Sequence, residues 1–181
     1  MDILDTKRFN EKLNIQPVSK ERLGRGVYGF NVVELGGLLW TAENAATTVG
    51  TDGKPLVEGV DYGRDYGAYY YTYDAADKIV PKGWRIPSAD DYLKLMEYGN
   101  DIIAKCDGGS SGKNGFNAQM LGCMTDRVHN RFQMAWFVCS NPPTASGFRQ
   151  CCRILKGSDI PLSIQYAHPD AKLTVRFCKD I

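Results

Sequence analysis

The sequence lacks any long apolar run. No stretch approaches the ~18 consecutive apolar residues that a membrane-spanning helix needs, and the first residues, MDILDTKRFNEKLN, carry charge from Asp2 onward. They do not have the apolar core of a signal peptide. We therefore expect cytoplasmic synthesis without an export signal, and no insertion into a membrane.

The chain also lacks an excess of charge of one sign. Lys and Arg number 22 against 21 Asp and Glu, which leaves a formal net charge of +1. Such a chain has no overall field to attract a phosphate backbone or anionic lipid, so we expect no nucleic-acid partner. At 181 residues, 43% of them hydrophobic, it has the length for one domain around one core.

Histidine is scarce, and the cysteines are not grouped. The two histidines, His129 and His168, stand in no nucleophile elbow or cysteine-protease string. The six cysteines lack the paired short spacing of a zinc site, and acidic residues do not recur at the spacing of a calcium loop. We therefore expect no metal and no other cofactor. The thiols should be mostly reduced, with adjacent Cys151 and Cys152 pointing to opposite faces of a strand rather than joined in a strained disulfide.

The sequence does contain a pattern of early helices followed by strands. A weak apolar spacing over residues 1–26 predicts a short helix and then a connector. Alternation over residues 27–40 around Gly36-Gly37 predicts a β-hairpin. Further strands are predicted at three apolar bursts, residues 134–138, 160–164 and 173–177. The expected fold class is α+β with a strand-rich C-terminal half.

A helix start is predicted at Ser88. Ser88 follows a proline and is followed by two aspartates, so it reads as an N-cap with negative charge in the first helical turn. The helix is then expected to turn Leu93, Met96 and Ile103 toward the core.

Several short strings occur in an order that is typical of one family. They are residues 37–44 (GLLWTAEN), 69–71 (YYY), 81–88 (PKGWRIPS), 115–118 (GFNA), 135–137 (AWF) and 175–180 (VRFCKD). Together they resemble the Fibrobacter succinogenes major paralogous domain. The resemblance implies a C-type-lectin-like fold for residues 27–181, with residues 1–26 as a helical leader or connector. Trp40, Trp84 and Trp136 lie in these strings and are expected in the core.

Residues 137–170 resemble the variable region of another group with lectin-like folds, the variable proteins of diversity-generating retroelements. Mutated adenines in Asn-type codons cannot yield Lys, Glu, Gln, Met or Trp. Of these, the segment holds only Gln150, Lys156 and Gln165. An ordinary surface loop with a pair of strands explains the segment equally well.

The retroelement resemblance implies a ligand-binding face, with aromatic and Arg side chains as its anchors. Strand register decides which candidates are exposed, because a slip of one residue exchanges the two faces. The candidates are Phe137, Cys139, Asn141, Phe148, Arg149, Cys151, Arg153, Leu155, Ser158, Asp159, Ile160, Tyr166 and His168.

The function implied is display of a binding surface rather than catalysis. The chain resembles a retroelement-diversified variable protein or a phage receptor-binding protein, whose ligand would be a protein or glycan on a cell surface. Residues 5–18 also resemble leaders of small proteins from phages and prophages of gut Bacteroidales, which implies a virion-associated protein. A leader helix would either join copies into a homo-oligomer or pack on its own domain.

The alternative function comes from the same group of folds. It is a formylglycine-generating type of oxidase that acts on a peptide thiol. The spacing of Cys139, Cys151 and Cys152 does not reproduce the cysteine pair of those enzymes.

Overall fold

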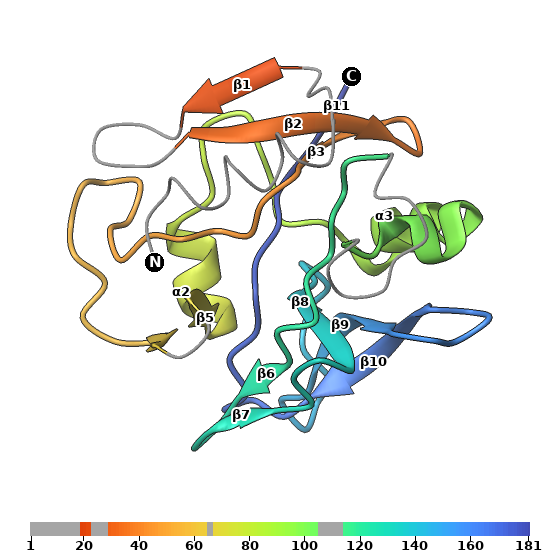
Figure 1. Ribbon diagram of the computed structural model, residues 1–181. Helices are drawn as coiled ribbons and strands as arrows, with labels where there is room; N and C mark the ends of the chain where they lie inside the picture. The colour runs from red at the N-terminus through yellow and green to blue at the C-terminus, as the bar shows by residue number, and fades with distance from the viewer. Residues whose placement is uncertain (1–18, 23–28, 65–66, 105–113) are drawn as a thin grey trace.

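The predicted hairpin is present at the start of a four-stranded antiparallel sheet (Figure 1). The computed structural model describes residues 19–22, 29–64, 67–104 and 114–181. The sheet has the order β1 (Ser19–Arg22), β2 (Gly29–Leu35), β3 (Leu38–Thr41) and β11 (Cys178–Asp180). Gly36 and Gly37 join β2 to β3 with φ angles of 57° and 74°, the left-handed conformation that a tight hairpin turn requires. The predicted leader helix lies outside the described residues, apart from residues 19–22, which form β1.

A second antiparallel sheet carries the strands of the C-terminal half. Its order is β10 (Leu162–Ala167), β9 (Arg149–Leu155) and β8 (Met134–Val138). The remaining strands form two separate hairpins. One pairs β4 (Val60–Gly63) with β5 (Ala68–Tyr71), and the other pairs β6 (Cys123–Met124) with β7 (Val128–His129). The helices are α2 (Tyr73–Lys78), α3 (Ala89–Leu93) and the 3₁₀ helix η1 (Lys94–Ile102).

The molecule is therefore mixed α and β, with most of its regular structure in short antiparallel strands. No helix among the described residues is long and apolar enough to cross a membrane. The predicted strand at 173–177 is wrong. Residues 172–174 make isolated bridges to three different segments, and the last regular strand begins only at Cys178.

The β8–β9–β10 sheet separates two hydrophobic cores. On one face Phe137 and Cys152 pack in the cluster that contains Trp40. On the other face Val138 and Cys151 pack in a second cluster. The adjacent cysteines thus point to opposite faces as predicted, and the five cysteines in the described part of the chain are all free thiols.

Helix α3 begins where the sequence predicts, but it buries a different face. Ser88 caps it by accepting a hydrogen bond from the backbone N–H three residues later. The core receives Tyr92 and Leu95, both fully buried, whereas Leu93 and Met96 are 40% and 43% exposed. After Leu93 the chain tightens into a 3₁₀ helix with three residues per turn, so a phase extrapolated with the α-helical period fails. Ile103 is buried as expected.

Arg85 links the start of α3 to the C-terminal strand. Its guanidinium pairs with Asp91 of α3 and donates to the carboxylate of Asp180 at 3.1 Å. Its backbone exchanges two hydrogen bonds with Cys178, each 2.9 Å long. The string at residues 81–88 therefore acts as a clamp between the helix and β11.

Arg176, which precedes β11, is a second arginine that ties separate segments together, and it is buried. Its side chain is 1% exposed and donates to the backbone carbonyls of Thr41, Phe116 and Asn117. Its Nε also donates to Asn44 Oδ1 at 2.5 Å. The guanidinium therefore links residue 176 to the end of β3 and to the loop at residues 116–117 through side-chain hydrogen bonds, without strand pairing.

Candidate ligand-binding face

Strand register removes three predicted candidates from the surface. Phe137, Cys139 and Cys151 are each at most 1% exposed. Phe137 pairs with Cys152 and points into the core around Trp40, while Cys151 points into the opposite core. Other parts of the protein cover both faces of this sheet along much of its length. Neither the odd-numbered nor the even-numbered residues of a strand are therefore exposed along the whole strand. These three side chains cannot contribute to a binding surface.

The other ten candidates reach the surface to different degrees. Phe148, Asp159, Ile160, Tyr166 and His168 are exposed. The half-buried ones are Asn141, Arg149, Arg153, Leu155 and Ser158.

The structure brings only some of these candidates together. The rings of Phe148 and His168 meet edge to face, with centroids 5.7 Å apart. Ser158 and Ile160 lie instead in the turn between β9 and β10, where the Ser158 hydroxyl donates to the Ile160 carbonyl at 2.9 Å. Asn141 lies near α3 and accepts a hydrogen bond from the Ala89 N–H at 2.7 Å, so its amide oxygen caps that helix.

A half-buried strip crosses the middle of the β8–β9–β10 sheet. We call it the strand patch, and it consists of Trp136, Arg153, Leu155, Ser163 and Gln165. Arg153 on β9 pairs directly with Trp136 on β8 and with Ser163 on β10. Directly paired residues lie on the same face of a sheet. The patch is therefore a row of neighbouring side chains on rigid strands, on the face opposite Phe137 and Cys152.

Two buried donors in the strand patch lack a partner in the described part of the chain. Trp136 Nε1 and Arg153 Nε are both shielded from solvent and have no hydrogen-bond partner among the described residues. Leaving a buried donor unpaired costs about 1–3 kcal/mol. Trp136 also differs from its prediction as a core residue, because it is only partly buried and packs against one of the two cores.

Sequence reasoning found Arg153 and Leu155 of the patch and missed the other three as binding residues. These three residues are found by combining the alternation of side chains along each strand with the register that pairs the strands. Once Arg153 is paired with residue 136 of β8 and residue 163 of β10, the same-face residues of those strands follow. The sequence does not state that register.

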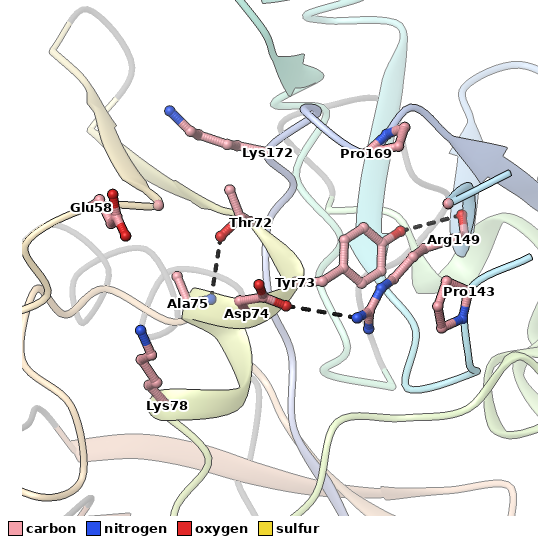
Figure 2. Close-up of a pocket in the computed structure, with 12 residues that line it drawn as sticks. Glu58, Thr72, Tyr73, Asp74, Ala75, Lys78, Pro143, Arg149, Pro169 and Lys172 are labelled. Atoms are coloured by element: carbon pink, nitrogen blue, oxygen red, sulfur yellow. Dashed lines mark hydrogen bonds and ion pairs between the residues drawn. The ribbon is translucent and has the colours of Figure 1, made fainter.

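A pocket of about 530 Å³ lies at the other end of β9 (Figure 2). Its lining comes from the first turn of α2, the loop before β9 and the segment that follows β10. Figure 2 shows Arg149 beside Tyr73, with the guanidinium carbon 5.0 Å from the ring centroid. Arg149 also lies 3.7 Å from the carboxylate of Asp74.

The pocket has charges of both signs on its lining. Lys172 pairs with Asp61 at 2.5 Å, and Glu58 and Lys78 add one charge of each sign. Burial raises the pKa of Tyr73 well above its ordinary value, so its phenol stays protonated and donates to the Gln150 carbonyl at 2.9 Å. Such a lining suits a polar ligand of low net charge, and none of its residues is a Cys or His.

Sequence reasoning missed this pocket, because it predicted no helix between residues 40 and 88, where α2 lies. The missed helix α2 is capped by Thr72, whose hydroxyl accepts a hydrogen bond from the Ala75 N–H at 3.2 Å. Thr72 followed by Asp74 in the first turn is a capping signal that the tyrosine-rich run before it obscured.

Four of the five described cysteines are buried, and Cys123 is partly buried. Burial is the largest cause that raises the pKa of Cys151 to about 12, and it is also the largest cause that raises the pKa of Cys139 and of Cys152. Within the described ranges, no group of three or more His, Cys, Asp or Glu side chains could hold a metal ion.

Comparison with known proteins supports the family resemblance for one part of the chain. Residues 33–108 match the family model described as the Fibrobacter succinogenes major domain. No curated protein and no solved structure matches the chain. The matched residues run from β2 through η1, so the β8–β9–β10 sheet and its strand patch lie outside the match.

Proposed function

We propose that this chain is a ligand-binding display protein with a C-type-lectin-like fold, and that the strand patch is the centre of its binding face. One observation carries the proposal. Trp136 Nε1 and Arg153 Nε are buried donors on directly paired residues, and no described residue accepts from either. Both donors are shielded from solvent, so a ligand reaches them only when the side chains that cover them move aside; two ligand acceptors would then remove the cost of both unpaired groups.

The support beneath the patch favours tight recognition. The opposite face of the same strands packs Phe137, Cys152 and Ile154 in a core. Side chains on strands that are fixed from behind lose little freedom when a ligand binds, and this raises affinity for a given contact area. Trp and Arg are also the residue types that most often dominate binding energy at interfaces.

Exposed aromatic side chains also lie near one end of the same sheet, although Tyr166 follows Gln165 on β10 and therefore lies on the opposite face from the strand patch. Tyr166 is 57% exposed and Phe148 39% exposed, and both belong to the segment that resembles a retroelement variable region. We propose that the ligand is a protein or glycan on a cell surface and that the protein is a retroelement-diversified or phage receptor-binding protein carried on a virion. A homo-oligomer would present several copies of the face and gain avidity.

The oxidase alternative receives less support. Its chemistry needs a thiolate, and burial raises the pKa of Cys139, Cys151 and Cys152 so that each thiol stays protonated at neutral pH. No observation on the described cysteines favours it over ligand binding.

The first test is binding by matched variants. We expect labelled protein to bind a subset of glycans on a printed array or a subset of gut Bacteroidales strains in flow cytometry. Arg153→Ala should weaken that binding at least tenfold, since it removes a central Arg anchor. Lys82→Ala, which removes the same charge at an exposed position outside the patch, should leave it unchanged. Equal binding by wild type and Arg153→Ala would refute the assignment of the patch.

The second test addresses diversification through sequence variation in the native population. Deep sequencing of the 3′ end of the gene should show adenine-directed variation at exposed or half-buried codons such as 153, 155 and 163. Codons 137 and 152, whose side chains are fully buried, should stay constant. A uniform sequence over 137–170 would leave a binder of fixed specificity and rule out the retroelement mechanism.

A further inference from the structure

A second, smaller cavity lies away from the strand patch. Its volume is about 100 Å³, and it is lined by residues 43–46, residues 67–69 at the start of β5, and side chains near Asn117. Its lining shares no residue with the strand patch or the pocket beside α2. A site here would thus be separate from the proposed binding face.

Asn117 is the unusual member of this lining. It is 5% exposed, and both its Nδ2 and its Oδ1 lack a hydrogen-bond partner among the described residues. Its φ of 51° lies in the left-handed region, which Asn tolerates better than most residues. Its backbone carbonyl is held by Arg176 Nη2 at 3.1 Å, so the amide is presented from a fixed position. A buried amide with a free donor and a free acceptor is expensive unless something binds it.

The two charged residues of the cavity are engaged by the protein itself. Glu43 accepts hydrogen bonds from the backbone and side-chain nitrogens of Asn31 at 2.7 and 2.5 Å. Arg176 donates to backbone carbonyls and to Asn44. These charges also cancel. The chemistry left for a ligand is that of neutral hydrogen-bonding groups, to which Gln119 adds a second amide.

An aromatic pair adjoins the cavity. Tyr69, one of its lining residues, packs its ring against Tyr62 with centroids 4.7 Å apart, and Tyr62 is 41% exposed. Tyr69 lines the cavity and its partner Tyr62 adds exposed aromatic surface next to it, so the site can take a ligand with an apolar face and a hydroxylated edge. A sugar ring has both. The small volume admits one edge of a ring rather than a whole oligosaccharide.

We propose that this cavity binds the hydroxylated edge of a neutral saccharide. The Asn117 amide donates to one hydroxyl and accepts from its neighbour, while the ring of the sugar rests beside Tyr62 and Tyr69. This assignment does not depend on the strand patch, and either site could fail without the other.

Solution NMR of the whole chain tests the proposal, with glucose, galactose, mannose and N-acetylglucosamine as separate probes. We expect at least one sugar to shift the side-chain amide signals of Asn117 in a saturable way, with a Kd on the order of 1–10 mM. Asn117→Gly keeps the left-handed backbone and removes the amide, so it should weaken this binding at least tenfold. Arg153→Ala should bind the sugar as wild type does, which separates this site from the strand patch.

Stability provides a readout that a structural role for Asn117 would change. Because its amide makes no hydrogen bond within the described protein, Asn117→Gly should shift the unfolding midpoint by no more than about 4 °C. Should that variant fail to fold, Tyr62→Ala at an exposed position should also weaken sugar binding. Three results would overturn the proposal. They are no amide shift at about 100 mM of any probe, equal binding by both variants and wild type, or a crystal structure grown with sugar in which only ordered water contacts the amide.

Discussion

Replacing Asp91 by Asn tests the clamp that joins α3 to β11. The Asp91 carboxylate accepts hydrogen bonds from the Ser88 N–H and the Ser88 hydroxyl, each at 2.8 Å, and pairs with the Arg85 guanidinium. Its side chain is 7% exposed. The substitution keeps the shape of the side chain and removes its charge and one acceptor oxygen, while Asp90→Asn makes the same change at an exposed position on the same helix.

The size of the effect follows from these contacts. Hydrogen bonds to a charged group contribute about 1.5–3 kcal/mol each, and breaking a buried ion pair costs more. Asn retains one acceptor oxygen, and the Arg85 side chain is 39% exposed, so water hydrates the charge that is left behind. We therefore expect Asp91→Asn to lower the free energy of unfolding by about 2–3 kcal/mol at pH 7 and the midpoint by about 4–12 °C.

The pH dependence of the difference identifies its cause. Burial acts to raise the pKa of Asp91, but the hydrogen bonds from Arg85 and Ser88 outweigh it and hold the pKa well below its ordinary value. A depressed carboxyl pKa stabilises the fold fully above the unfolded pKa of about 3.9, and that contribution is lost as the pH falls toward the folded pKa. The stability gap between wild type and Asp91→Asn should therefore narrow below about pH 4.

Urea unfolding followed by circular dichroism from pH 7 to pH 3 measures both effects. Asp90→Asn should stay within about 0.5 kcal/mol of wild type throughout. If Asp91→Asn unfolds like Asp90→Asn at pH 7, or if its deficit does not change with pH, the ion pair and the capping box do not stabilise the fold as argued.

One further substitution and one chemical-labelling experiment probe the packing around the second sheet. A Cβ at Gly122, whose φ is 73°, would lie 1.9 Å from the His129 carbonyl oxygen. Gly122→Ala should therefore lower the free energy of unfolding in urea by about 3 kcal/mol or more. An unchanged unfolding midpoint would contradict this close approach. Alkylation at pH 8 with peptide mapping should label Cys139 and Cys152 only after unfolding, because burial raises the pKa of both thiols; rapid labelling of the folded protein would contradict their burial.

The parts of the fold that the sequence predicted are those with local causes. The β2–β3 hairpin follows from Gly36-Gly37, because a tight turn between twisted strands needs positive φ at both positions. The start of α3 follows from Ser88, because the cap hydroxyl meets a backbone N–H only three residues away. Neither needs knowledge of the rest of the chain.

The failures concern long-range pairing. Leu93 and Met96 looked like core residues, but Tyr92 and Leu95 occupy the core because the helix tightens and packs against the sheet. The C-terminal burst at 173–177 reads as one strand, although Leu173 and Thr174 form single bridges to Tyr71 and Phe137, about 100 and 37 residues away, and the regular strand begins only at Cys178. Local patterns carry no information about such partners.

The candidate site was predicted in part for the same reason. The segment 137–170 does contain the strand patch residues Arg153 and Leu155, yet composition could not separate them from Phe137 or Cys151. The unpaired amide of Asn117 gives no sequence signal at all. Whether a buried donor or acceptor lacks a hydrogen-bond partner depends on which groups the folded chain places next to it, and the local sequence does not show this.

The division of the molecule would allow the proposed binding face to vary without loss of the fold. Residues 33–108, which match the family model, include α3 and the buried Tyr92 and Leu95, and α3 packs against β9 and β10. They therefore cover one face of the second sheet and fix its backbone. Along β9 the buried Cys152 and Ile154 alternate with the half-buried Arg153. A substitution at Arg153 changes the surface while its neighbours hold the strand, whereas the same change one residue away would open a cavity in the core.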